Sequence, residues 1–145
     1  MKKISRYIFL LFILMVAGCK AYAQDTIPYV ISADFLMEDN ASEYSICGVN
    51  IYLLNKSEKE MKAVNIVFFL FDKDGEPAYE CRNKISVEVE QDLLEGEDSN
   101  FCISLDKYMN AVPSEALQVD YLYLAKIEYE DGSSWEDPYG LIAFK

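Results

Sequence analysis

Carboxylates at alternate positions form the clearest candidate for ligand chemistry, in the segment Asp72-Lys73-Asp74-Gly75-Glu76. Oxygen ligands at this spacing begin the calcium loop of EF-hand proteins, which ends on a glutamate at its twelfth position. The twelfth position here is Asn83, and neither flank has the pattern of a helix. Asp-Gly followed by Pro77 is typical of a turn, because glycine accepts positive φ and proline ends strand pairing. The sequence therefore predicts a turn with solvated acids, and no metal or cofactor.

The residues that carry acid–base or nucleophilic catalysis form no known arrangement in this chain. There is no histidine, and the order of the 25 acidic residues singles out no pair for general acid–base work. Ser133 and Ser134 follow Gly132 but lack the G-x-S-x-G frame of a nucleophile elbow. We therefore expect a protein without enzymatic activity.

Cysteines are the remaining reactive side chains. Cys47 lies on the apolar side of an alternating segment, Cys102 lies between polar residues of another, and Cys81 follows the turn at Pro77. There is no C-x-x-C pair, and without histidine the usual zinc site lacks ligands. In an oxidising compartment we expect a Cys81–Cys102 disulfide that leaves Cys47 as a buried, inert thiol.

A fourth cysteine, Cys19, belongs to an export signal over residues 1–23. Basic side chains precede an uninterrupted apolar segment of 11 residues, 7–17, which is shorter than the ~20 residues that span a bilayer. Two cleavage sites follow. Val16-Ala17-Gly18-Cys19 matches a bacterial lipobox, in which Cys19 is lipidated and becomes the mature N-terminus, and Ala21-Tyr22-Ala23 matches the A-x-A site of the ordinary signal peptidase. We favour the lipobox, because it requires a cysteine directly after the apolar segment.

The mature chain is strongly acidic. Four of the 13 basic side chains lie within residues 1–23, whereas all 25 acidic ones follow, so residues 24–145 carry a net charge of −16. Such a surface repels nucleic acid and anionic lipid, and it favours solubility. We therefore expect no nucleic-acid partner, and contact with a membrane only through a lipid on Cys19. The export signal predicts a location in the periplasm or on the outer cell surface.

Alternation of apolar and polar residues, interrupted by short polar turns, predicts a chain built almost entirely of β-strands. Residues 24–145 are long enough for one domain, and the expected architecture is an immunoglobulin-like sandwich of two antiparallel sheets, with a small open barrel as the alternative. Asp106 is expected to cap a short helical turn at 106–111. The seven expected strands cover residues 29–37, 44–54, 63–72, 85–90, 101–105, 119–130 and 134–144.

Two short segments, Asn55-Lys56-Ser57 and Phe68-Phe69-Leu70-Phe71-Asp72, resemble the FxLYD family of bacterial extracytoplasmic domains. The Phe, Leu and Asp of the motif are present, and Phe71 replaces its Tyr. The resemblance continues through the turn Leu94-Glu95-Gly96-Glu97 and covers residues 47–105. It implies a fibronectin- or immunoglobulin-like fold, and the family has no assigned activity.

The last two strands predict a hairpin with two apolar faces. If Asp131-Gly132 are the two central residues of its turn, Lys126 lies opposite Asp137 and Leu122 lies opposite Leu141. Strand 63–72 is expected beside strand 119–130, where it extends the outer of the two faces. One face contains Tyr121, Tyr123, Ala125, Ile127, Ile142 and Phe144. The other, the expected outer face, contains Leu122, Leu124, Trp135, Tyr139, Leu141 and Ala143. Strand 63–72 extends this outer face with Val67, Phe69 and Phe71.

An apolar face of this size requires a cover, because free domains rarely expose one. Either an intramolecular segment covers it (73–84, 106–118 or the mature N-terminus), or a protein or peptide partner does, such as a second copy of the chain. Trp and Tyr are enriched in binding hot spots, so we expect a partner. The alternative is a carbohydrate-binding protein or hydrolase with a loop-borne site of acids and aromatics. The expected contact residues are Trp135, Tyr139, Leu141, Leu122, Leu124, Val67, Phe69 and Phe71.

The lipobox makes a direct prediction. A palmitate analogue fed to cells that express the chain should label it, and the label should be lost in the Cys19→Ala variant, because only the Cys19 thiol accepts the lipid. Labelled protein is detected on a gel after conjugation to a dye. Cleavage after Ala23 with no label in the wild-type chain would establish the ordinary signal peptidase instead.

Overall fold

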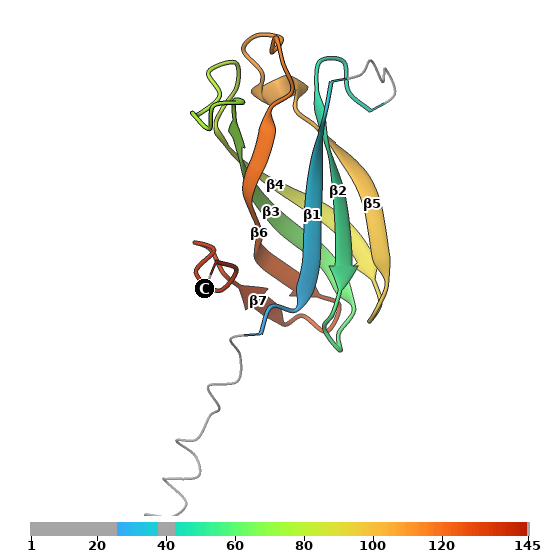
Figure 1. Cartoon of the computed structure of the whole chain (residues 1–145). Helices are drawn as coiled ribbons and strands as arrows, with labels where there is room; N and C mark the ends of the chain where they lie inside the picture. Colours follow the sequence, from blue (N-terminus) through green and yellow to red (C-terminus); the bar gives the residue numbers. More distant parts are fainter. Residues whose placement is uncertain (1–25, 38–42, 145) are drawn as a thin grey trace, which may run out of the picture.

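Figure 1 shows the computed structural model of the chain, which describes residues 26–37 and 43–144. The export signal, including Cys19 and both cleavage sites, lies outside the described residues. The described part forms seven antiparallel strands and one short 3₁₀ helix, and it contains no helix that is long and apolar enough to cross a membrane. The elements are β1 (Tyr29–Leu36), β2 (Gly48–Asn55), β3 (Met61–Phe71), β4 (Lys84–Leu93), β5 (Asp98–Ser104), η1 (Asp106–Tyr108), β6 (Gln118–Tyr129) and β7 (Ser134–Glu136).

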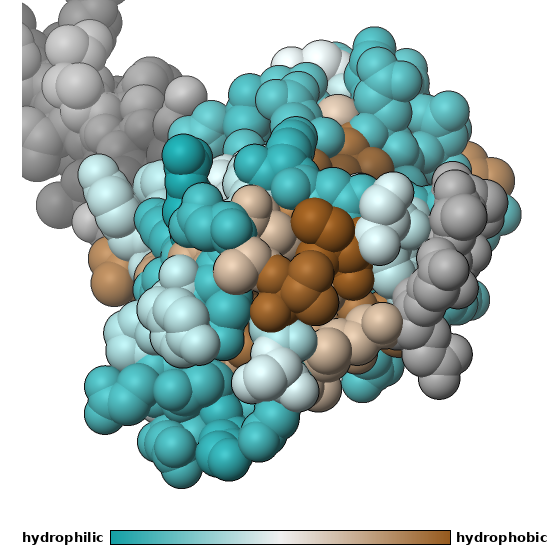
Figure 2. Space-filling view, turned by 90° about the horizontal axis from the view of Figure 1, so that it is seen from above, coloured by the Kyte–Doolittle hydropathy of each residue, from teal (hydrophilic) through white to brown (hydrophobic). Residues whose placement is uncertain are grey.

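The strands form two sheets that pack face to face, so the predicted β-sandwich is confirmed and the open barrel is wrong. One sheet has the order β1-β2-β5 and the other β4-β3-β6-β7. β3 lies beside β6, as expected. Figure 2 views the end of the sandwich that carries the β3–β4 and β5–β6 connections, where hydrophobic side chains reach the surface within a hydrophilic surround.

The core lies between the two sheets, and alternation along the strands fills it. Val49, Ile51 and Leu53 of β2 are fully buried, and Cys47 continues the same row just before the strand. Phe68 and Leu70 of β3 face them from the other sheet, in the same cluster. Each such side chain stabilises the fold by about 1.5–3 kcal/mol. Because Phe68 and Leu70 point inward, the residues between and after them must point outward.

Asn55 joins two turns at one end of the sandwich. Its side-chain nitrogen donates to the carbonyls of Lys59 (2.8 Å) and Leu93 (2.9 Å), and its side-chain oxygen accepts the N–H of Ser57 at 2.9 Å. Its backbone carbonyl accepts the N–H of Gly96. A buried amide is tolerated only when it is satisfied in this way. Asn55 therefore fixes the β2–β3 turn against the β4–β5 turn.

A second polar contact crosses from one sheet to the other. The pairing of β3 with β6 shifts between Asn65 and Ile66, which leaves Ala125 as an extra residue in β6 and forms a β-bulge. Next to this bulge, the hydroxyl of Tyr29 accepts the buried N–H of Leu124 at 3.0 Å. Burial raises the pKa of Tyr29, so its hydroxyl stays neutral. The ring of Tyr29 packs edge-to-face on Trp135, with the ring centres 5.7 Å apart.

The expected register of the last hairpin is wrong by one residue. Gly132 has a φ of +79° and donates to the carbonyl of Tyr129, while Tyr129 donates to that of Ser133, so the loop has three residues and ends in a glycine bulge. Lys126 therefore lies opposite Glu136, not Asp137. Trp135 lies opposite Ile127, on the core side of the sheet.

This geometry corrects the assignment of faces. Leu124 is fully buried in the core, and Leu122 and Trp135 pack against the core from the same side. The three residues do share a face, as expected, but that face is the inner one. The predicted placement of Leu122, Leu124 and Trp135 on the outer face is therefore wrong, because alternation alone does not say which side of a two-sided apolar strand is covered by the other sheet.

Two local predictions are also corrected. Cys47, Cys81 and Cys102 are free thiols, so the expected Cys81–Cys102 disulfide is wrong. Cys81 is buried in the core, where burial raises its pKa to about 11, whereas the Cys102 thiol lies against Gly48, in the strand between the inward-facing Phe101 and Ile103. The two side chains therefore lie on opposite faces of the three-stranded sheet.

Asp106 does not cap a helix as expected. η1 is a single turn with no side-chain cap. The carboxylate of Asp106 instead accepts the N–H groups of Ser45 and Ile46, both at 2.8 Å, and these bonds lower its pKa. Asp106 therefore ties the β5–β6 connection to the residues that precede β2.

The Tyr29 hydroxyl is expected to stabilise the sandwich measurably. Tyr29→Phe leaves the N–H of Leu124 buried without its acceptor, so the free energy of unfolding should fall by about 1–3 kcal/mol. Urea denaturation followed by Trp135 fluorescence measures the change. Tyr79→Phe, at an exposed tyrosine, is the matched control and should be neutral. Equal midpoints for the two variants would contradict the role given to Tyr29.

Candidate binding groove on the outer face of the four-stranded sheet

The outer face of the four-stranded sheet has a hollow lined mostly by aromatic side chains. Phe69 and Phe71 reach it from β3, because their neighbours Phe68 and Leu70 point into the core. Tyr121 and Tyr123 reach it from β6. The volume of this hollow, here named the aromatic groove, is about 410 Å³, and its lining residues are Phe69, Phe71, Asn83, Lys84, Tyr121, Tyr123, Tyr139 and Phe144.

Tyr121 is the centre of the aromatic cluster. Its ring packs on those of Phe69 (5.8 Å between centres), Phe71 (6.0 Å) and Phe144 (5.7 Å). The pairs with Phe69 and Phe144 are edge-to-face, and such packing contributes about 0.5–1.5 kcal/mol per pair beyond buried area. Even so, 52% of Tyr121 stays exposed. The ring is held in place by its neighbours and still presents a large free surface.

The backbone of Tyr121 is strained. Its φ of +47° is the only positive φ among the described residues other than glycine, and this region is costly for a bulky side chain. The register shift between Val67 and Phe69 places two residues of β6, Tyr121 and Leu122, opposite one residue of β3. A bulge of this kind re-aims a side chain. Here it turns the Tyr121 ring outward while Leu122 stays against the core.

The segment after β7 forms one wall of the groove. It was expected to continue as a strand to residue 144, but the strand ends at Glu136 and the chain turns. Asp137 causes the turn: one carboxylate oxygen accepts the N–H of Leu141 at 2.8 Å, and the other accepts those of Ile142 (3.0 Å) and Ala143 (3.1 Å). The three N–H donors satisfy the carboxylate, which explains how Asp137 can be buried to 97% of its surface.

Gly140 allows this wall to pack closely. Its φ is +68°, and a Cβ at this position would lie only 2.9 Å from the ring of Phe144 and 3.3 Å from that of Tyr123. Only glycine meets both conditions. The rings of Phe144 and Tyr123 in turn pack edge-to-face at 5.8 Å. The sheet face is therefore partly covered by residues 137–144, a segment that was not among the three expected covers.

Few polar groups lie in the groove. Lys84 lies over the ring of Phe69, with its ammonium 5.7 Å from the ring centre, and the Asn83 side chain donates to the carbonyl of Leu70 at 2.6 Å. The Tyr123 hydroxyl donates to the carbonyl of Pro138 at 3.3 Å, and burial raises the pKa of Tyr123. These groups suit the binding of an apolar ligand with one or two polar contacts.

The structure brings together only part of the predicted site. Phe69, Phe71 and Tyr139 line the groove, Val67 is buried beside it on β3, and Leu141 is exposed on the turn that forms its wall. Tyr121, Tyr123 and Phe144 were expected on the opposite face. Alternation along β3 predicts its outward rings, because Phe68 and Leu70 point inward. The outward positions of Tyr121 and Tyr123 on β6 were not predicted, because no glycine in the sequence marks the bulge.

Comparison with known proteins gives no further guide. The chain matches no family model, no curated protein and no solved structure. The resemblance to the FxLYD family therefore stays a prediction. Among residues 26–37 and 43–144, no group of three or more acidic or cysteine side chains is placed to hold a metal ion.

Asp137 is expected to hold the wall of the groove. Asp137→Ala removes the acceptor of three N–H groups, so the free energy of unfolding should fall by about 1–3 kcal/mol. Amide exchange at Leu141, Ile142 and Ala143 should accelerate by about tenfold or more. Hydrogen exchange followed by NMR measures both, with Glu136→Ala as the exposed control. A loss of stability without selective exchange at these three amides would contradict this role.

Proposed function

We propose that this chain is an exported, lipid-anchored, non-enzymatic module that binds an apolar segment of a protein partner in the aromatic groove. The observation that carries the proposal is the exposed surface of Tyr121 and Tyr139, which are 52% and 79% exposed above a hollow sheet face. A site built on the apolar face of a sheet favours a binding module over a loop-borne catalytic or sugar site.

The groove has the size and chemistry for one or two apolar side chains. Its volume of about 410 Å³ lies within the range of ligand sites in proteins, about 300–1,000 Å³. Tyrosine rings lose little conformational entropy on binding because each has only two side-chain torsions, and they are enriched where partners bind tightly. The strain at Tyr121 supports a role in binding, because strained residues concentrate at functional sites.

The strand order supports the immunoglobulin-like part of the proposal. β3, β6 and β7 follow one another across their sheet as strands C, F and G do in immunoglobulin domains, and β4 lies on the edge next to β3. β1, β2 and β5 form the facing sheet. Of the motif residues in the FxLYD resemblance, Phe68 and Leu70 lie in the core, and Asp72 begins the turn that follows β3.

A lipid on Cys19 would hold the groove close to a membrane. Nine residues lie between Cys19 and Tyr29, where β1 begins, and the ten Cα–Cα steps from one to the other span at most about 36 Å when extended. A partner embedded in the same membrane, or attached to it, would then meet the module at high effective concentration. The net charge of −16 for residues 24–145 keeps the module away from anionic lipid.

Site-specific photocrosslinking tests the groove. With p-benzoylphenylalanine at Tyr139, in cells that make the chain, we expect one discrete crosslinked product. The same probe at Tyr52, on the outer face of the other sheet, should give none. The mass of the product shows whether the partner is a second copy of the chain.

The Tyr121→Gly variant separates binding from folding. Glycine accepts a φ of +47° without strain, so the domain should stay folded by circular dichroism while the Tyr139 crosslink falls at least severalfold. Crosslinking that is unchanged in this variant, or equal at Tyr139 and Tyr52, would refute the groove as the binding site.

A further inference from the structure

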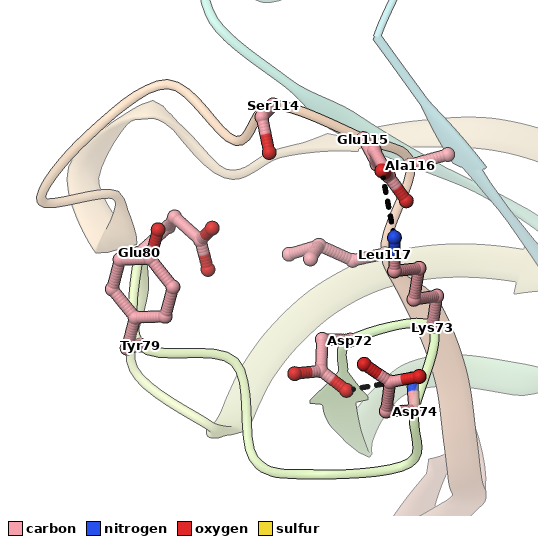
Figure 3. A pocket seen from close by; sticks show the side chains of 9 residues that line it. All are labelled: Asp72, Lys73, Asp74, Tyr79, Glu80, Ser114, Glu115, Ala116 and Leu117. Atoms are coloured by element: carbon pink, nitrogen blue, oxygen red, sulfur yellow. Dashed lines mark hydrogen bonds and ion pairs between the residues drawn. The ribbon is translucent and has the colours of Figure 1, made fainter.

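A second, smaller pocket lies at the end of the sandwich between the turn that follows β3 and the segment that precedes β6 (Figure 3). Its volume is about 140 Å³, enough for the head of a single side chain. It shares no lining residue with the aromatic groove. Its lining residues are Asp72, Lys73, Asp74, Tyr79, Glu80, Ser114, Glu115, Ala116 and Leu117.

Glu80 is the unusual member of this pocket. The residue is 93% buried, and its Oε2 atom has no hydrogen-bond partner. Its backbone is fixed, because its carbonyl accepts the N–H groups of Asn110 and Ala111. Burial of an unpaired carboxylate oxygen is costly. Figure 3 shows the Glu80 carboxylate pointing into the pocket, so a ligand there would supply the missing donor.

The remaining charges make the pocket attractive to cations. One oxygen of Asp72 accepts the N–H groups of Asp74 (2.9 Å) and Glu76 (3.0 Å), which holds the turn in place. The ammonium of Lys73 pairs with Glu115 at 3.0 Å on the rim. The lining thus carries four carboxylates against one ammonium, and three negative charges remain uncompensated.

We propose that this pocket binds the guanidinium group of an arginine side chain that a protein partner presents. A metal ion needs several oxygen ligands that converge on one point, and no such group is found among the described residues. A guanidinium needs one or two acceptors, and its planar fork gives a carboxylate two parallel N–H donors. Tyr79, which is 81% exposed on the rim, offers a ring face on which the group can stack.

Titration with N-acetyl-arginine methylamide, followed by NMR, tests the proposal. We expect saturable shifts confined to residues 72–80 and 114–117, with a Kd of the order of millimolar, as is usual for so small a ligand. Calcium chloride at the same ionic strength should produce no saturable shift. A saturable calcium response, or no response to the arginine derivative at about 20 mM, would overturn the proposal.

Two variants separate the role of Glu80 from simple structural support. Glu80→Gln keeps the shape of the side chain, removes its charge, and should weaken binding of the arginine derivative at least tenfold. Because it also removes an unpaired buried charge, it should raise the melting temperature of the free domain. Glu115→Gln, on the rim, should change affinity less than threefold. A lower melting temperature with unchanged affinity in Glu80→Gln would show that Glu80 is only structural.

The proposals for the pocket and for the groove can be tested separately. Tyr121 lines the aromatic groove and is not a lining residue of the pocket, so Tyr121→Gly should leave the affinity for the arginine derivative unchanged. Loss of that affinity in Tyr121→Gly would show that the response arises in the groove, and it would overturn the pocket as a separate site.

Discussion

The two bulges of β6 determine what each face of the four-stranded sheet presents. Each bulge adds one residue opposite β3 and therefore reverses the alternation of side chains beyond it. The first turns Tyr121 outward, and the second brings Ile127 to the same inner face as Leu124. The hydroxyl of Tyr29 accepts the N–H of Leu124 beside the second bulge. This contact crosses between the sheets and fixes β6, the strand that contributes Tyr121 and Tyr123 to the groove.

Alternation predicted the parts of the fold in which the ladder is regular. The row Val49, Ile51 and Leu53 is confirmed, because a strand with one buried face has only one register that buries its apolar residues. The expected pairing of 63–72 with 119–130 is also confirmed, but that expectation came from the strand order of an immunoglobulin-like sandwich. β6 is apolar on both faces, so its sequence does not specify which face is inner. Its bulges carry no glycine, and they lie in its pairing with β3, one of them beside the Tyr29 contact, which sequence alone does not reveal.

The C-terminal segment shows a different limit. Its apolar residues predicted a strand to residue 144, yet Asp137 captures three backbone N–H groups and Gly140 takes a positive φ. The signal was present, because Asp-Pro and a nearby glycine favour a turn. The apolar residues that follow nevertheless favoured a strand in the prediction. The turn that was not predicted forms the wall of the groove. The register of the last hairpin was also mispredicted, because Asp-Gly fits both two-residue and three-residue hairpin loops.

The end of β3 brings two unlike surfaces together. Phe71 lines the aromatic groove, and the next residue, Asp72, lines the acidic pocket. A ligand in the groove gains free energy from the burial of apolar area, which salt hardly weakens. A cation in the pocket gains it from charge, which salt screens at the open rim more than at the buried Glu80. The dependence of binding on ionic strength therefore distinguishes the two surfaces, even when one partner contacts both.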